Sequence, residues 1–400
     1  GSGFLSGGGL YLDGTDVTVA GRLEFIGNAA EQGGAIYMED STVVFEGPLL
    51  FSNNSGSGDG GAVWGANSDI SVAGSVVFIG NRADFSGGAM FISSSTITFS
   101  KNSAASEGGA VFMTDSSSLV VDGPTATFTD NVANVGGAVF VRELSTLRLA
   151  GTGVTMSGNA AASSGGAMEC ESITVLQVEG AQFISNSCGV SGGAVSLVSA
   201  GVAETFLREG NPAIFRDCWF AENKANGTGG AMHISGGFAD ITGTDFHNNT
   251  AGRSGGAVLV SGTANLANCT LRGNQAGIGP AVANTVTLTL SSTELVSNTL
   301  TCDDDGLFLD WKNVSAYETA CEACPEQCPT CTIQNPDRAL LCEPVLEFTT
   351  SRTADGMLES LELEPGYWRS SSTSAYIREC YHGPACVGGS KGYCETGYEG

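Results

Sequence analysis

Residues 126–141 read Ala-Thr-Phe-Thr-Asp-Asn-Val-Ala-Asn-Val-Gly-Gly-Ala-Val-Phe-Val, and this stretch decides the fold. An apolar residue, Phe128, is followed three positions later by Asn131, and Gly136-Gly137-Ala138 comes shortly after. The same combination returns along most of the chain. It is therefore an internal repeat rather than a local motif.

Pairs of an apolar residue and an asparagine mark the repeat: Phe25 and Asn28, Phe51 and Asn54, Phe78 and Asn81, Phe99 and Asn102, Phe128 and Asn131, Met156 and Asn159, Phe183 and Asn186, Phe220 and Asn223, Phe246 and Asn249, Leu271 and Asn274, and Leu295 and Asn298. Most of the asparagines are 24 to 29 residues apart, which is too short for a propeller blade or a helix pair. Segments such as 42–45 and 95–99 alternate polar and apolar residues, as short strands do. We therefore expect an all-β, single-stranded, right-handed parallel β-helix of about eleven coils over residues 1–301.

The asparagine in each coil should stack in register with the asparagines of the neighbouring coils. Its carboxamide can bond to the turn backbone and to the asparagines above and below, which would satisfy buried polar groups along the axis. All eleven asparagines named above are predicted to form this ladder. The glycine pairs should allow a positive φ at a corner where the coils crowd. Residues 198–213 lengthen one coil and should bulge from the wall as a loop.

The second and third residues after each glycine pair should lie on opposite faces of a strand. The second is aliphatic or Met and should point inward. The third should point outward, and in the first six coils it is aromatic: Tyr11, Tyr37, Trp64, Phe91, Phe112 and Phe140. This aromatic column has two interpretations, namely ring stacking under a covering loop, or a contact strip for glycans or another protein.

Nine of the 13 cysteines lie in the last hundred residues: Cys302, Cys321, Cys324, Cys328, Cys331, Cys342, Cys380, Cys386 and Cys394. We expect a Cys-rich segment over 302–345 and a second module over 346–400. The two Cys-x-x-Cys pairs within 321–331 lack the spacer of a zinc knuckle, which favours disulfides in an oxidising compartment over a zinc site. In the coils, Cys218 and Cys269 should lie about 9.6 Å apart, too far for a disulfide.

The formal net charge of −26 disfavours nucleic acid and anionic lipid as partners. An acidic surface favours solubility, with a Ca²⁺-binding role as the alternative, and we otherwise expect no cofactor. No apolar run is long enough to span a membrane. The pattern starts within a repeat and ends within a module, which predicts a piece of a longer protein.

The combination of Phe-x-x-Asn with Gly-Gly-Ala resembles the repeat of chlamydial polymorphic membrane proteins, and it is similar to β-helix repeats in surface proteins of algae and other protists. The end of the chain, Cys394-Glu-Thr-Gly-Tyr-Glu-Gly400, resembles the last part of an epidermal-growth-factor-like module, truncated before its final cysteine. The chlamydial resemblance implies autotransported adhesins with a C-terminal barrel. The different tail implies a eukaryotic extracellular protein. Five sequons would suit glycosylation there: Asn53, Asn226, Asn248, Asn268 and Asn313.

Many parallel β-helices act on polysaccharides through clustered carboxylates. The carboxylates of the coils are instead scattered over turns, as at Glu31, Asp59 and Glu107. We therefore expect an extracellular structural or adhesive rod rather than an enzyme, with proteins or glycans as partners. A polysaccharide lyase, hydrolase or epimerase is the alternative. Self-assembly through open coil ends is also compatible with the pattern.

Overall fold

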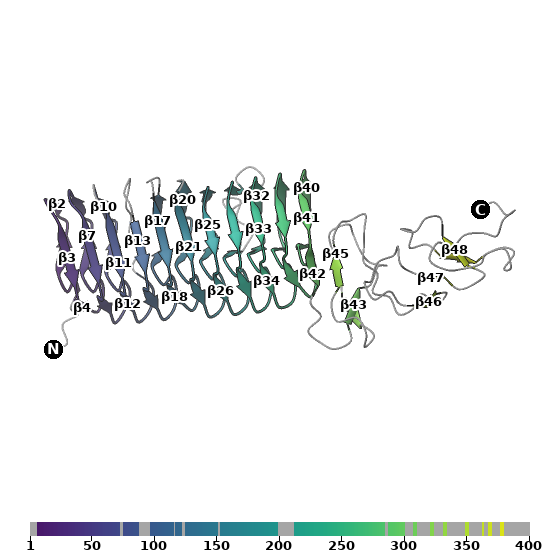
Figure 1. Cartoon of the computed structure of the whole chain (residues 1–400). Coiled ribbons are helices and arrows are strands. Elements are labelled where there is room, and N and C mark those ends of the chain that lie inside the picture. The colour runs from purple at the N-terminus through teal and green to yellow at the C-terminus, as the bar shows by residue number, and fades with distance from the viewer. Residues whose placement is uncertain are drawn as a thin grey trace.

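The protein is a parallel β-solenoid (Figure 1). The computed structural model describes residues 6–72, 75–87, 97–115, 117–121, 125–150, 153–198, 212–284 and 287–300, with a few short strands beyond them. In the described parts every regular element is a strand. The chain stacks coil upon coil, so that most strands pair in parallel with their equivalents in the coils before and after them.

The sheet that we call the long sheet has eleven strands, one from each Phe-x-x-Asn repeat. They are β3 (Leu23–Ile26), β7 (Leu49–Ser52), β11 (Val76–Ile79), β13 (Ile97–Ser100), β17 (Ala126–Thr129), β21 (Val154–Ser157), β25 (Gln182–Ile184), β29 (Trp219–Ala221), β33 (Asp245–His247), β37 (Thr270–Arg272) and β41 (Glu294–Val296).

After each ladder asparagine the chain enters a sheet of two- or three-residue strands. These are β4 (Ala29–Ala30), β8 (Ser55–Gly56), β12 (Arg82–Ala83), β14 (Ser103–Ala104), β18 (Val132–Ala133), β22 (Ala160–Ala161), β26 (Ser187–Cys188), β30 (Lys224–Ala225), β34 (Thr250–Ala251), β38 (Gln275–Ala276) and β42 (Asn298–Leu300).

The strands after the glycine pairs form the wall that we call the aromatic wall. They are β1 (Leu10–Asp13), β5 (Ile36–Glu39) and β9 (Val63–Ala66), then β15 (Val111–Met113), β19 (Val139–Arg142), β23 (Met168–Glu171), β27 (Val195–Val198), β31 (Met232–Ser235), β35 (Val258–Val260) and β39 (Val282–Asn284).

The remaining strands of the coils form two sheets that lead back to the long sheet. They are β2 (Asp16–Val19), β6 (Thr42–Phe45) and β10 (Asp69–Val72), then β16 (Ser118–Val121), β20 (Thr146–Ala150), β24 (Val175–Glu179), β28 (Ala213–Arg216), β32 (Phe238–Thr242), β36 (Thr263–Ala267) and β40 (Thr287–Ser291).

The core is a column of apolar side chains inside the coils. Because strand residues alternate between faces, the Phe of each Phe-x-x-Asn repeat faces inward, and Phe51, Phe128 and Phe220 are fully buried. The parallel register places each ring on the next, with centroids 4.6 Å apart for Phe51 and Phe78 and 4.8 Å apart for Phe78 and Phe99. Burial of each Phe contributes roughly 2–3 kcal/mol, and only stacking makes that burial complete.

The two glycines of each pair have different roles. The first takes a positive φ, as at Gly136 (60°) and Gly165 (63°). The second has an ordinary φ, but a Cβ on Gly166 would overlap the carbonyl oxygen of Gly193 in the next coil. Our expectation of positive φ therefore holds for the first glycine only, and the second is needed because two backbones approach closely.

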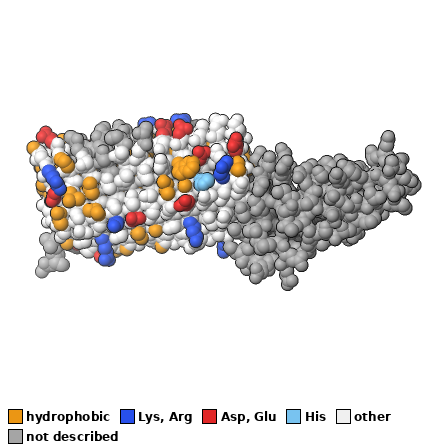
Figure 2. Space-filling view, in the orientation of Figure 1, with side chains coloured by type: hydrophobic (Ala, Val, Ile, Leu, Met, Phe, Trp, Pro, Cys, Tyr) orange, Lys and Arg blue, Asp and Glu red, His pale blue; other side chains and the backbone are white. Residues whose placement is uncertain are grey.

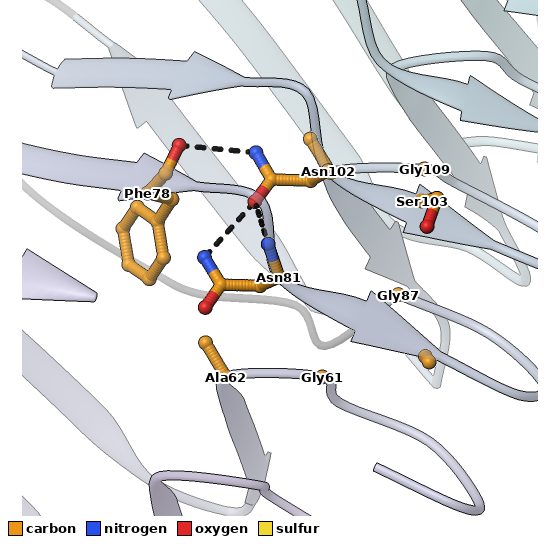
Figure 3. A pocket seen from close by; sticks show the side chains of 10 residues that line it. Gly61, Ala62, Phe78, Asn81, Gly87, Asn102, Ser103 and Gly109 are labelled. Carbon is orange, nitrogen blue, oxygen red and sulfur yellow. Dashed lines mark hydrogen bonds between the residues drawn. The ribbon is translucent and has the colours of Figure 1, made fainter. Parts of the chain in front are cut away.

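The ladder asparagines lie inside the solenoid and are bonded from coil to coil. Oδ1 of Asn102 accepts from the backbone N–H and from Nδ2 of Asn81, at 3.0 and 2.9 Å, while Nδ2 of Asn102 donates to the carbonyl of Phe78 (Figure 3). The same three bonds recur along the stack: Oδ1 of Asn159, for example, accepts from the backbone N–H and Nδ2 of Asn131, and its Nδ2 donates to the carbonyl of Phe128.

Ten of the eleven predicted ladder positions are buried polar residues, and the exception is Asn28, which is half-buried at the first coil. The buried members are Asn54, Asn81, Asn102, Asn131, Asn159, Asn186, Asn223, Asn249, Asn274 and Asn298. The ladder is also continuous in the later coils, where Oδ1 of each asparagine accepts from the one before it: Asn249 from Asn223, Asn274 from Asn249 and Asn298 from Asn274. The eleven asparagines therefore form one uninterrupted hydrogen-bonded row along the axis.

The residue before each ladder asparagine turns the corner with a left-handed backbone. It is Gly27, Asn53, Gly80, Lys101, Asp130, Gly158, Ser185, Glu222, Asn248, Gly273 or Ser297, all with φ between 52° and 66°. Asn tolerates this conformation better than most residues. A left-handed turn thus accounts for an asparagine at three of the predicted sequons, because Asn268, at another corner, also has a φ of 53°. The other two are Asn53 and Asn248. All four sequon asparagines among the described residues are exposed, namely Asn53, Asn226, Asn248 and Asn268.

The last coil is followed by a strand of opposite direction. β45 (Cys331–Ile333) pairs antiparallel with β42, which places Cys331 opposite Leu300. The other described strands of the tail are β43 (Leu307–Leu309), β44 (Cys321–Ala323), β46 (Thr349–Ser351), β47 (Glu362–Leu363), β48 (Tyr367–Arg369) and β49 (Ile377–Glu379). The rest of the predicted segments 302–345 and 346–400 lies outside the described residues, as do Asn313, Cys302, Cys324, Cys328, Cys342, Cys380, Cys386 and Cys394.

Candidate binding surfaces

The predicted aromatic column lies on the outer side of the aromatic wall, opposite the buried Ile36 and Met38. Tyr11, Tyr37 and Trp64 occupy one register row. Their rings stack almost in parallel, with centroids 5.1 Å apart for the tyrosine pair and 4.6 Å apart for Tyr37 and Trp64. Phe112 and Phe140 stack in the same way further along, and Phe91 lies outside the described residues.

The column is not the continuous exposed strip that alternation alone predicts. Tyr11 is 54% exposed, but Tyr37 is 9% and Phe140 2% exposed. The reason at Tyr37 is that both ring faces are covered by neighbouring rings, while its hydroxyl donates to Glu39 at 2.9 Å. Burial, assisted by the bond to Glu39, raises the pKa of Tyr37 to about 12. Only parts of the column are therefore accessible.

An arginine covers the second part of the column. The guanidinium carbon of Arg142 lies 5.1 Å from the ring centre of Phe112 and 6.0 Å from that of Phe140. Nη1 of Arg142 lies 3.5 Å from Oε2 of Glu107, and this ion pair helps to position the guanidinium over the rings. This arrangement combines a cation–π contact with an ion pair, and it hides Phe140 from solvent.

The same register row becomes polar in the later coils, where Glu169, Ser196 and His233 follow Phe140. Glu169 is only 7% and Ser196 only 1% exposed. Within the described chain neither Oε2 of Glu169 nor Oγ of Ser196 has a hydrogen-bond partner. Burial raises the pKa of Glu169 to about 7, and burial also lowers the pKa of His233.

The long sheet carries an exposed indole that is not among the predicted site residues. Trp219 directly precedes the buried Phe220, so it faces outward, and it is 39% exposed. Its ring stacks on His247 of the next coil with centroids 5.8 Å apart. The alternation between faces could have revealed it, because any residue next to the core Phe must lie on the outer face.

The four cysteines of the coils are free thiols inside the solenoid. Sγ of Cys218 lies 3.2 Å from the carbonyl oxygen of Arg216, and Sγ of Cys269 lies 3.4 Å from that of Ala267. Burial is the main cause that raises all four thiol pKa values, to about 12 for Cys188 and Cys218. Thiolate, the reactive form, is therefore suppressed.

We expect Cys170, Cys188, Cys218 and Cys269 to resist alkylation in the folded protein. For Cys188 and Cys218 a pKa near 12 lowers the thiolate fraction at pH 8 by about a thousandfold relative to an ordinary thiol. Burial raises the pKa of the other two thiols as well, and it blocks access to all four. Mass spectrometry of the peptides after iodoacetamide treatment measures this, with the urea-unfolded chain as the control. Labelling of these four sites at the same rate in both states would contradict the buried arrangement.

No group of three or more His, Cys, Asp or Glu side chains that could hold a metal ion occurs among the described residues. In the same part of the chain, no helix has the length and apolar character needed to cross a membrane.

Two coils match a family model. Residues 48–66 and 96–114 match the Chlamydia polymorphic membrane protein repeat. Each segment holds one Phe-x-x-Asn pair and one glycine pair, which is Gly60-Gly61-Ala62 in the first and Gly108-Gly109-Ala110 in the second. Comparison with curated proteins and with solved structures gives no match. The chain is therefore a parallel β-solenoid repeat protein that is similar, over two of its coils, to a repeat of a bacterial membrane protein family.

Proposed function

We propose that this protein is a structural or adhesive scaffold at the cell surface, a rigid rod that presents contact surfaces to other proteins or to glycans. The observation that carries the proposal is the match of two coils to the Chlamydia polymorphic membrane protein repeat, set in an unbroken eleven-stranded ladder. The resemblance implies surface adhesins. An extracellular setting with a disulfide-bonded, epidermal-growth-factor-like tail is part of the same proposal.

The architecture suits such a role because it is stiff. Most neighbouring coils are joined by four parallel strand pairings, and the asparagine ladder and stacked Phe rings add to these connections. A rigid surface loses little conformational entropy on binding. The accessible parts of the aromatic column add large, already ordered side chains, since Tyr37 fixes the rings on both sides of it.

An adhesion assay tests the proposal. Beads that carry the full chain should bind to cells and their extracellular matrix, and the double variant Tyr11→Thr, Trp64→Thr should bind at least about fivefold less, as loss of an aromatic hot spot does. The control is Ile26→Thr, which removes an equally exposed apolar side chain (58%, against 54% for Tyr11) from a different wall.

Two results would overturn this proposal. One is an absence of adhesion by the wild-type chain, together with an intracellular location in antibody labelling of intact cells. The other is product formation from a polysaccharide panel, because the proposal is that the rod binds and does not catalyse.

A further inference from the structure

Trp219 stands where the fold does not need an aromatic side chain. In the long sheet, the outward positions in register with it hold Glu24, Leu50, Val77, Thr98, Thr127, Thr155, Gln182, Asp245, Thr270 and Glu294. None of these is aromatic. Thr, Gln and acidic residues therefore satisfy the sheet equally well at this position, and an indole with 39% exposure needs another explanation.

Hydrogen-bonding side chains surround the indole. Gln182 precedes it and Asp245 follows it in the same register row, one coil away on either side, or about 4.8 Å. His247 stacks against the indole, and Arg272 follows His247 in the neighbouring row. Figure 2 shows hydrophobic side chains on this face beside a histidine, with acidic and basic side chains around them. A flat apolar ring is thus bordered by donors and acceptors.

This combination matches the chemistry of a neutral sugar ring. The C–H face of a pyranose is weakly positive and apolar, so it packs on the negative face of an indole. The hydroxyl groups at the edge of the sugar need both donors and acceptors, which a carboxamide and a carboxylate supply together. The nearby charges of Asp245 and Arg272 oppose each other, and the net charge of −26 disfavours polyanions.

We propose that Trp219 is the platform of a saccharide-binding site on the long sheet, which takes a neutral hexopyranose unit of an oligo- or polysaccharide. Trp219 stacks on the ring, while Gln182 and Asp245 bind its hydroxyls. This site lies on a different wall from the aromatic column, so it goes beyond the scaffold function and is tested separately from it.

The test is a titration of the full chain with neutral oligosaccharides built from glucose, mannose or galactose, monitored by tryptophan fluorescence and by saturation-transfer NMR. At least one should bind with a Kd of about 1 mM or below. Trp219→Thr introduces the residue that the sheet already carries at Thr98, Thr127 and Thr155, so it should fold, and it should weaken binding at least tenfold. Asp245→Asn should weaken it severalfold. Ile26→Thr, which removes an exposed apolar side chain from the same sheet at the first coil, should leave saccharide binding unchanged.

The proposal is overturned if no neutral oligosaccharide binds at about 10 mM, tenfold above the expected Kd, or if Trp219→Thr binds as tightly as the wild-type chain. Binding of only acidic oligosaccharides would overturn the assignment of a neutral ring. Loss of saccharide binding in Trp219→Thr with normal bead adhesion would support this site and leave the aromatic column as a separate contact surface. Loss of adhesion with intact saccharide binding in Trp219→Thr would overturn the saccharide site and place Trp219 in the adhesive surface instead.

Discussion

Replacement of Asn159 by Ala should destabilise the solenoid by about 4 kcal/mol. Oδ1 of Asn159 accepts from both the backbone N–H and Nδ2 of Asn131, and its Nδ2 donates to Phe128 and Asn186. Asn159 is fully buried, so removal of the carboxamide leaves several polar groups without partners and without water. Each such group costs roughly 1–3 kcal/mol. Urea unfolding followed by circular dichroism measures the loss, and hydrogen exchange should show the amide of Asn131 opening faster.

Asn28→Ala is the matched control, because Asn28 is half-buried at the first coil and its side chain donates to Asn54 alone within the described bonds. Its loss should cost only about 1 kcal/mol. Asn159→Asp keeps the volume of the side chain but replaces the donor Nδ2 with an oxygen. That oxygen faces the carbonyl oxygen of Phe128 and Oδ1 of Asn186, to which Nδ2 donates in the wild type. It should be strongly destabilising at neutral pH and partly recover at low pH. Equal costs for Asn159→Ala and Asn28→Ala would show that the ladder does not stabilise the stack.

The stacking of the coils could be predicted from the sequence because it depends on local signals that repeat. Phe128 and Asn131 keep the same spacing as Phe51 and Asn54, so the inward face and its polar ladder follow from strand alternation. The register then follows as well, since a shift by one residue would expose every Phe. The parallel solenoid was predicted on these grounds and is confirmed.

The accessibility of the outer face could not be predicted, because it depends on neighbours from other coils. Tyr37 and Tyr11 occupy equivalent positions, yet the ring of Tyr37 is covered on both faces and that of Tyr11 is not. Phe140 is buried beneath Arg142, a contact that no spacing rule contains. Trp219 differs from these residues, because its outward direction follows from its position next to Phe220, and only its 39% exposure and its stacking on His247 depend on the neighbouring coils.

Glu169 is the third residue after its glycine pair, so strand alternation predicts that it faces outward. It does lie on the outer side of its strand, but it is almost completely buried. Its position in the row of Phe140 and Ser196 gives it little contact with water, and Glu171 and Glu107 add like charge. The carboxyl is therefore easier to keep protonated in the folded chain than in the unfolded chain.

Glu169→Gln should consequently stabilise the protein at high pH and not at low pH. The pKa of Glu169 is raised from 4.5 to about 7 on folding, so the contribution of this residue is fully present below pH 4.5 and is lost as the pH rises through 7. The difference between the two pH limits is about 3 kcal/mol. Urea unfolding at pH 4, 6 and 8 should show the variant and the wild type converging at pH 4, with the variant about 3 kcal/mol more stable at pH 8.

Ser145→Ala removes another buried oxygen that has no hydrogen-bond partner within the described chain, but it removes no charge, so its effect should not change with pH. A stability difference for Glu169→Gln that does not change with pH would contradict this prediction, because it would mean that folding does not raise the pKa of Glu169. The row from Phe140 to His233 would then admit enough water to solvate the ionised carboxylate.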